Sequence, residues 1–210
     1  MKLFGKSDTK IRIHHTSILL NIIVAAVLLI NLELYHAAYI MCIYIGIQAS
    51  VFIHELSHAF VASIYKMKTE SITLYPFGGM AQVCMDTRIK YSELFISIAG
   101  PASNILIAGA LVPFIIFEVP ILYEIGVLNF ITAFFNMIPA YPMDGGRALR
   151  SILSSRLGHI YATKISITVS LLISILIFGL GVVISPWLFF ISAPLLFMIH
   201  LEYKNIKLLN

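Results

Sequence analysis

Residues 51–61 read Val-Phe-Ile-His-Glu-Leu-Ser-His-Ala-Phe-Val and place three ionisable side chains inside an apolar run. If this run is a helix, His54 and His58 lie on one face because they are four residues apart, and both imidazoles can bind one metal ion. Glu55 leaves the helix about 100° round from His54, so it can reach a metal-bound water without being a ligand. The stretch therefore predicts a helix with the H-E-x-x-H arrangement of zinc hydrolases.

The residues on both sides of this motif are those of a membrane span. An ionisable group in such a setting costs about 2.5–3.5 kcal/mol on insertion scales and normally faces a protein interior. A structural metal clip, or a hydrogen-bonded polar cluster between two helices, would also account for the two histidines and the glutamate. One divalent ion would neutralise and satisfy all three groups together, which favours a functional metal site.

The composition excludes a soluble globular protein. Of the 210 residues, 60% are hydrophobic and 11% are charged, which is the balance of a polytopic membrane protein. The basic residues sit in short segments between apolar runs, so we expect no nucleic-acid partner. Cys42 and Cys84 form no C-x-x-C pair, and we expect them to be inert thiols.

Apolar runs of spanning length predict six transmembrane helices in a single domain over residues 1–210. Between the second and third spans, residues 71–83 alternate β-branched and apolar residues around a Pro and a Gly-Gly pair, which predicts a short membrane-associated β-hairpin. Residues 147–163 have the pattern of a short amphipathic surface helix. The fold class is therefore an all-α polytopic membrane protein with one hairpin. The predicted spans are 16–34, 37–65, 94–117, 121–138, 164–184 and 186–201.

The basic residues fix the orientation of these spans. All 14 Lys and Arg residues fall in segments 1–15, 66–92, 147–164 and 202–210. The positive-inside rule then places both termini in the cytoplasm of a multi-pass integral membrane protein. His54 precedes Lys66 by 12 residues, or roughly 18 Å of helix. The metal site is therefore expected below the cytoplasmic surface but within the hydrocarbon zone.

Asp144 lies six residues beyond the end of the fourth predicted span. Pro139 and Pro142 break regular helix there and allow the chain to fold back toward the second span. Two histidines and one carboxylate, with a fourth position open for water, are the ligand set of a catalytic zinc. Glu55 could then take the proton of the bound water and deliver it to a leaving amine. The alternative for Asp144 is a turn residue in Pro-x-Asp-Gly-Gly.

Two motifs together resemble the site-2 protease family of intramembrane zinc metalloproteases. Residues 54–58 match its H-E-x-x-H pattern, and residues 136–146 match its N-x-x-P-x-x-P-x-D-G pattern as Asn-Met-Ile-Pro-Ala-Tyr-Pro-Met-Asp-Gly-Gly. Residues 100–104 match a further G-P-x-x-N element of many members. The six-span layout is most similar to the branch that includes the sporulation protease acting on a pro-sigma factor.

The resemblance implies His54, His58 and Asp144 as zinc ligands and Glu55 as the general base that activates a zinc-bound water. It implies Asn136 as a polar group near the scissile peptide, although an interhelical hydrogen bond would equally explain this residue. The implied activity is that of a zinc metalloendopeptidase in regulated intramembrane proteolysis. It would cleave membrane-embedded or membrane-associated proteins near the cytoplasmic face of a bacterial or archaeal cell membrane.

The resemblance also bears on partners. A pro-sigma factor or an anti-sigma factor is the kind of membrane protein substrate that it implies, with the lipid bilayer as the surroundings. We expect neither a PDZ domain nor the C-terminal nucleotide-sensing domain that relatives of the sporulation enzyme carry. Control would then come from an inhibitory or regulatory membrane partner or from the availability of substrate.

The predicted hairpin offers a mode of substrate binding. A helical membrane substrate must be unwound before cleavage, and an edge strand beside the metal could pair with its freed backbone by strand addition. Gly78 and Gly79 would permit close approach. A plain interfacial turn explains the same residues equally well.

Two other classes of protein compete with the protease hypothesis. A divalent-metal transporter would distribute metal-binding groups along a path, whereas the intramembrane acids and histidines here cluster at one depth. A catalytically silent scaffold would lack Glu55 or a ligand, whereas all four groups are present. The sequence therefore favours the protease.

Overall fold

The structure is a computed structural model that describes residues 9–75, 78–84, 89 and 91–183, with positions 196, 197, 199, 203 and 204 near the C-terminus. The sixth predicted span, 186–201, lies outside the described residues apart from three of these positions. Two compact units divide the chain. The first comprises Met1–Met85 and Ala99–Ala133, and the second comprises Asp86–Ile98 and Phe134–Asn210.

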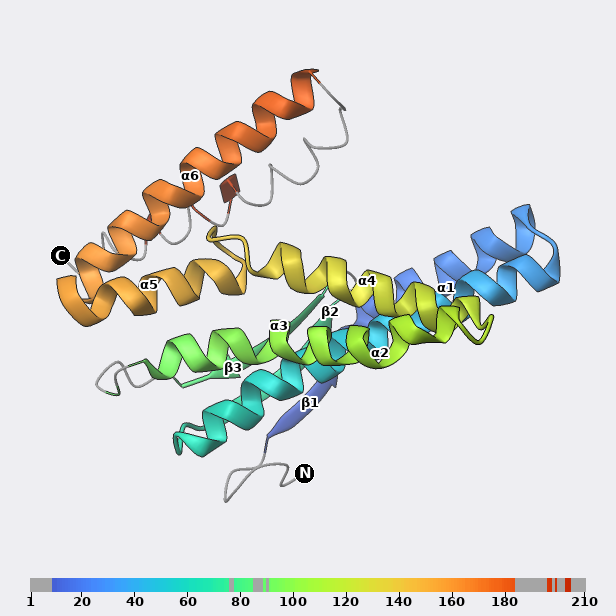
Figure 1. Ribbon diagram of the computed structural model, residues 1–210, viewed down its shortest axis with the longest axis horizontal. Helices are drawn as coiled ribbons and strands as arrows, with labels where there is room; N and C mark the ends of the chain where they lie inside the picture. Colours follow the sequence, from blue (N-terminus) through green and yellow to red (C-terminus); the bar gives the residue numbers. More distant parts are fainter. Residues whose placement is uncertain are drawn as a thin grey trace. The chain divides into compact units, whose positions relative to one another are not determined.

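Most of the described residues are helical, as the sequence predicts. Figure 1 traces the elements along the chain. The helices are α1 (His15–Asn31), α2 (Leu34–Ile64), α3 (Ser92–Leu111), the short 3-10 helix η1 (Val112–Ile115), α4 (Pro120–Asn136), α5 (Asp144–Leu157) and α6 (His159–Val183). The strands are β1 (Lys10–Ile13), β2 (Thr69–Tyr75) and β3 (Gly78–Val83).

Three helical segments in the described part of the chain are long and apolar enough to cross a membrane: α2, α3 continued by η1, and α6. Helices α1 and α4 are apolar too but have 17 residues each. These segments support the predicted integral membrane protein. That the chain has six spans remains a prediction.

The boundary between the surface helix and the fifth predicted span lies earlier than expected. The amphipathic helix covers Asp144–Leu157 rather than 147–163, and α6 begins at His159 rather than 164. Gly158 separates them with a φ of 78°, a left-handed backbone conformation that ends helices and that glycine adopts without steric cost. The sequence pattern did not predict this break at Gly158, because polar residues continue on both sides of it.

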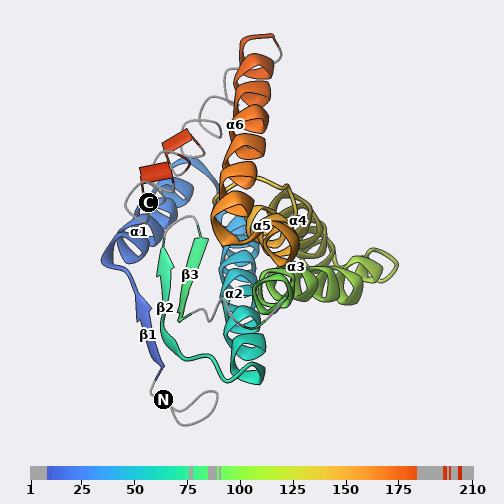
Figure 2. The same cartoon turned by 90° about the vertical axis from the view of Figure 1, so that its left-hand side faces the viewer.

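A small sheet belongs to the first unit. Strands β2 and β3 form the predicted antiparallel hairpin, with Ile72 opposite Ala81. Strand β1 adds to the other side of β2 in parallel, so the order is β1-β2-β3 and β3 is an edge strand. Helix α2 lies beside β3 (Figure 2). The sheet is thus one strand larger than the predicted hairpin.

Helices α2 and α4 pack closely within the same unit. A Cβ atom at Gly46 would lie 2.4 Å from Cδ1 of Ile125, so the α2 backbone is in direct contact with that side chain. One turn further along α2, Asn129 Nδ2 donates to Ser50 Oγ over 3.0 Å. Because hydrocarbon offers no hydrogen-bond partner, such pairs satisfy polar groups within spans. The contacts hold the middle of α2 against α4.

In the second unit, α6 packs against α5 and against the segment that precedes α5. Ser166, Ser170 and Ser174 form a fully buried stripe at a spacing of four residues. Small side chains at this spacing let other backbone segments approach a helix closely. The Ser170 hydroxyl accepts a hydrogen bond from the backbone N–H of Tyr141 over 2.9 Å. The turn before α5 is thereby fixed to α6.

Candidate metal centre

The two histidines of the motif lie side by side on α2. Both are buried, at 6% exposure for His54 and 5% for His58. Their ring centroids are 4.7 Å apart with an interplanar angle of 82°. The predicted helix and the shared face are therefore confirmed. Two buried imidazoles turned toward each other in this way have the chemistry of a metal site.

Gly100 of α3 defines the space that the histidines face. A Cβ atom at this position would lie 2.4 Å from Nε2 of His54 and 2.4 Å from Nε2 of His58. The two nitrogen atoms therefore converge on one small space, which any side chain at position 100 would fill. Zinc binds histidine nitrogen at about 2.0–2.1 Å. The space fits a metal ion because both nitrogens are within reach of a single point in it.

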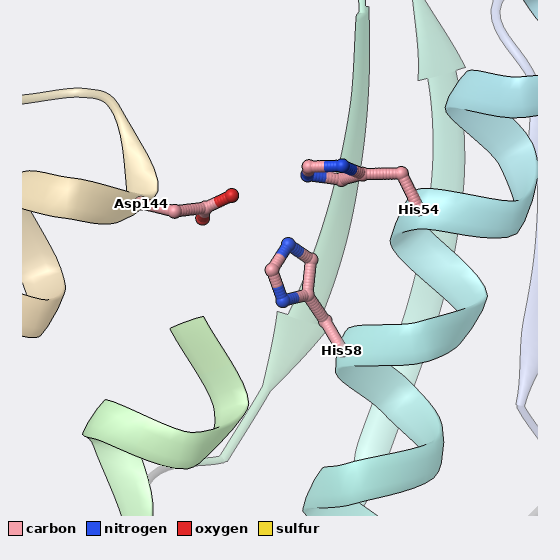
Figure 3. A group of neighbouring side chains, drawn as sticks. All are labelled: His54, His58 and Asp144. Carbon is pink, nitrogen blue, oxygen red and sulfur yellow. The ribbon is translucent and has the colours of Figure 1, made fainter. Parts of the chain in front are cut away.

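Asp144 completes the group of described residues that could hold a metal ion. Together with His54 and His58 it makes a group of two imidazoles and one carboxylate, and all three residues are buried (Figure 3). Two imidazole nitrogens and one carboxylate oxygen form the donor set of catalytic rather than structural zinc sites. The residues present therefore fit zinc by chemistry as well as by space.

The local fold explains why Asp144 is held where it is. It is the first residue of α5, where a carboxylate interacts favourably with the helix dipole. A Cβ atom at Gly145 would lie 2.3 Å from the carbonyl oxygen of Met137. One at Gly146 would lie 2.8 Å from the carbonyl carbon of Ala140. The Gly-Gly pair is thus needed because the preceding loop packs directly on the first turn of α5.

Glu55 is buried and is tied to the edge strand. Its Oε2 accepts a hydrogen bond from the backbone N–H of Ala81 over 2.8 Å. A Cβ atom at Gly79 would lie 2.3 Å from Cγ of Glu55, whereas Gly78 has no such neighbour within 4 Å. Of the two glycines singled out in the sequence, Gly79 makes the close approach and Gly78 does not.

Asn136 is the last residue of α4 and is half-buried.

The sequence analysis matched Gly100 to a motif but did not connect it with the histidines. A glycine followed by Pro101 inside an apolar span is a signal that could have pointed to a close backbone approach. Nothing in the sequence indicated the backbone donor of Ala81, because its role depends on the register of the sheet.

Comparison with known proteins identifies the class. Residues 42–120 and 118–180 match the model of Peptidase family M50. The chain belongs to this family, the site-2 proteases, as the two sequence motifs predicted.

Three comparisons show how far the likeness extends. A zinc metalloprotease of Methanocaldococcus jannaschii is 34% identical over 99% of this chain and 64% of its own length. The solved structure of a site-2 protease from the same organism has a TM-score of 0.69 and 32% identity, covering 95% of this chain and 94% of that chain. Stage IV sporulation protein FB of Bacillus subtilis is 29% identical over 67% of this chain and 52% of its own length. The chain thus spans less than two thirds of either full-length relative.

Proposed function

We propose that this chain is an intramembrane zinc metalloendopeptidase. It hydrolyses peptide bonds of membrane-embedded or membrane-associated proteins near the cytoplasmic face. The observation that carries the proposal is the convergence of His54 Nε2 and His58 Nε2 on one space beside Gly100, with Glu55 next to them on an apolar helix. Membership of Peptidase family M50 supports the same activity.

His54, His58 and Asp144 would hold the zinc ion. When bound, zinc supplies a Lewis acid that polarises the scissile carbonyl and lowers the pKa of water to about 7. Glu55 acts as the general base: its carboxylate takes a proton from the attacking water and delivers it to the leaving amine. Burial of Glu55 and its hydrogen bond from Ala81 fix the orientation of that carboxylate.

The edge strand β3 provides the binding surface for an extended substrate. The N–H of Ala81 faces away from β2, since it donates to Glu55 rather than to the neighbouring strand. A substrate strand that adds to this edge meets backbone groups beside the general base. Gly79 keeps the strand close to Glu55 because it has no side chain there.

Asn136 would contribute a polar group to the same reaction. It ends α4 eight residues before Asp144, at the start of the loop that leads to α5. Its amide can donate to the substrate backbone or to the oxyanion that develops during attack.

The distribution of charge supports a cytoplasmic location for the chemistry. Lys66 and Lys68 follow the C-terminal end of α2, and basic residues favour the inner face of a membrane. We infer a multi-pass protein of one domain with six spans and both termini in the cytoplasm. A pro-sigma factor or an anti-sigma factor is a suitable class of substrate, and a membrane partner would regulate access to the site.

Metal removal tests the proposal. The purified full chain in lipid nanodiscs is treated with a zinc chelator, dialysed, and assayed for cleavage of candidate single-span substrates. Cleavage should disappear with the metal and return when zinc is added back. His54→Ala should neither retain zinc nor regain activity. Cleavage that is unchanged after complete zinc removal would overturn the proposal.

A further inference from the structure

An ion pair outside the metal group links two helices of the second unit. Arg150 of α5 donates from Nε to Oε1 of Glu93 over 3.0 Å and to Oε2 over 3.3 Å, and its Nη2 also contacts Oε1. The side chains are 16% and 15% exposed. A guanidinium with several donors on one carboxylate is held in both position and orientation. Arg150 is therefore a fixed cation.

The guanidinium of Arg150 also lies over an aromatic ring. Its Cζ is 5.4 Å from the ring centroid of Tyr141, within the range of a cation–π interaction. The Tyr141 side chain is buried, and its backbone N–H donates to Ser170 on α6. The Ser170 hydroxyl in turn donates to the carbonyl of Ser166 over 2.7 Å. The side chain of Tyr141 is thus held by α5, and its backbone is held by α6.

Two residues, Pro142 and Met143, separate Tyr141 from Asp144, and the chain turns tightly there. The N–H of Met143 donates to the carbonyl of Ala140 over 2.9 Å, and the N–H of Gly146 donates to the carbonyl of Met143 over 3.1 Å. A Cβ atom at Gly146 would lie 2.8 Å from the Tyr141 nitrogen. The turn therefore has no free space in which to shift independently of the first turn of α5.

We propose that Arg150 is a positioning residue for Asp144, acting through Tyr141. Glu93 aims the guanidinium, the guanidinium fixes the ring of Tyr141, and the turn transmits that constraint to the carboxylate. The inference rests on the proposed function, in which Asp144 is a metal ligand. It goes further because it assigns a role in metal affinity to Glu93 and Arg150, which are not among the proposed ligands.

The test measures metal affinity and fold separately. Arg150→Met, Arg150→Lys, the double variant Glu93→Gln/Arg150→Met and the control Arg156→Met are purified as full chains. Arg156 is a suitable control because it is an exposed arginine in the last turn of the same helix. Competition with a chelator gives the zinc dissociation constant of each variant. The visible spectrum of the Co²⁺-loaded protein reports on the ligand geometry, and the thermal unfolding midpoint reports on the stability of the fold.

We expect that variants without Arg150 bind zinc more weakly, even when the stability of the fold is restored. Outer partners that orient ligands typically change metal affinity by about 10- to 100-fold. Arg150→Met should weaken zinc binding by that factor and alter the Co²⁺ spectrum. Arg150→Lys should also weaken zinc binding and alter the spectrum, because the lysine ammonium lacks the planar array of donors of a guanidinium. The double variant should recover the unfolding midpoint, since no unpaired charge remains, but not the affinity or the spectrum.

Other results would overturn the proposal. If the double variant binds zinc as tightly as wild type, the ion pair only neutralises its own charges. If Arg150→Met binds zinc normally, Arg150 positions nothing. Should Arg150→Met fail to fold, Tyr141→Leu replaces it, because this change keeps the ion pair and the backbone bond to Ser170 but removes the ring. If wild type and Arg156→Met bind no zinc, the proposed function itself fails.

Discussion

Oε2 of Glu55 accepts a hydrogen bond from the backbone N–H of Ala81 over 2.8 Å, which joins the helix of the metal motif to the edge strand of the sheet. The donor belongs to the free side of β3. A substrate that pairs with this edge would therefore meet a backbone group already engaged by the proposed general base. In the proposed mechanism, this one hydrogen bond would couple the binding of an extended chain to the position of the Glu55 carboxylate.

Gly79 should be essential for catalysis and Gly78 should not. A methyl group at position 79 would lie 2.3 Å from Cγ of Glu55, whereas one at position 78 would meet nothing within 4 Å. Gly79→Ala should displace the carboxylate and lower kcat by about 100-fold, the loss typical of a misplaced catalytic group. Gly78→Ala is the matched control. Zinc content should stay the same in both, and equal rates for the two variants would refute the contact.

Gly100→Ala should abolish metal binding. Its methyl group would lie 2.4 Å from both histidine Nε2 atoms and would occupy the space on which they converge. Gly109→Ala, on the same helix with no neighbour within 4 Å, controls for helix propensity. Metal analysis of the purified proteins should find zinc in the control alone. Full zinc occupancy in Gly100→Ala would place the metal elsewhere.

Cys84 reports on the end of the hairpin. The thiol donates to Glu70 over 3.4 Å, and this hydrogen bond, with smaller contributions from burial and from the glutamate charge, raises the pKa of Cys84. A raised pKa means less thiolate at a given pH, so alkylation near pH 8 should be slow. Glu70→Gln in a Cys42→Ser background should lower the pKa and shift the alkylation profile to lower pH. An unchanged profile would show that Glu70 does not contact the thiol.

The features that the sequence predicted depend on local spacing. The four-residue interval between His54 and His58 sets their shared face on any helix, and alternation in 71–83 is enough to predict β2 and β3. The features it missed depend on distant contacts. Strand β1 pairs with residues some sixty positions away, and Glu93 and Arg150 are 57 residues apart. Gly100 followed by Pro101 signals a close backbone approach, but only the fold reveals that the neighbours are His54 and His58.

The role of Glu55 is tested by comparing wild type with Glu55→Gln in one cleavage assay on candidate membrane substrates, with zinc measured in both proteins. Glutamine keeps the shape of the side chain and can still accept a hydrogen bond from Ala81, but it cannot take a proton. We expect about one zinc per chain in both proteins and a loss of cleavage of about 100-fold or more in the variant. Equal cleavage by the two zinc-loaded proteins would contradict the assignment of Glu55 as the base of a metalloprotease.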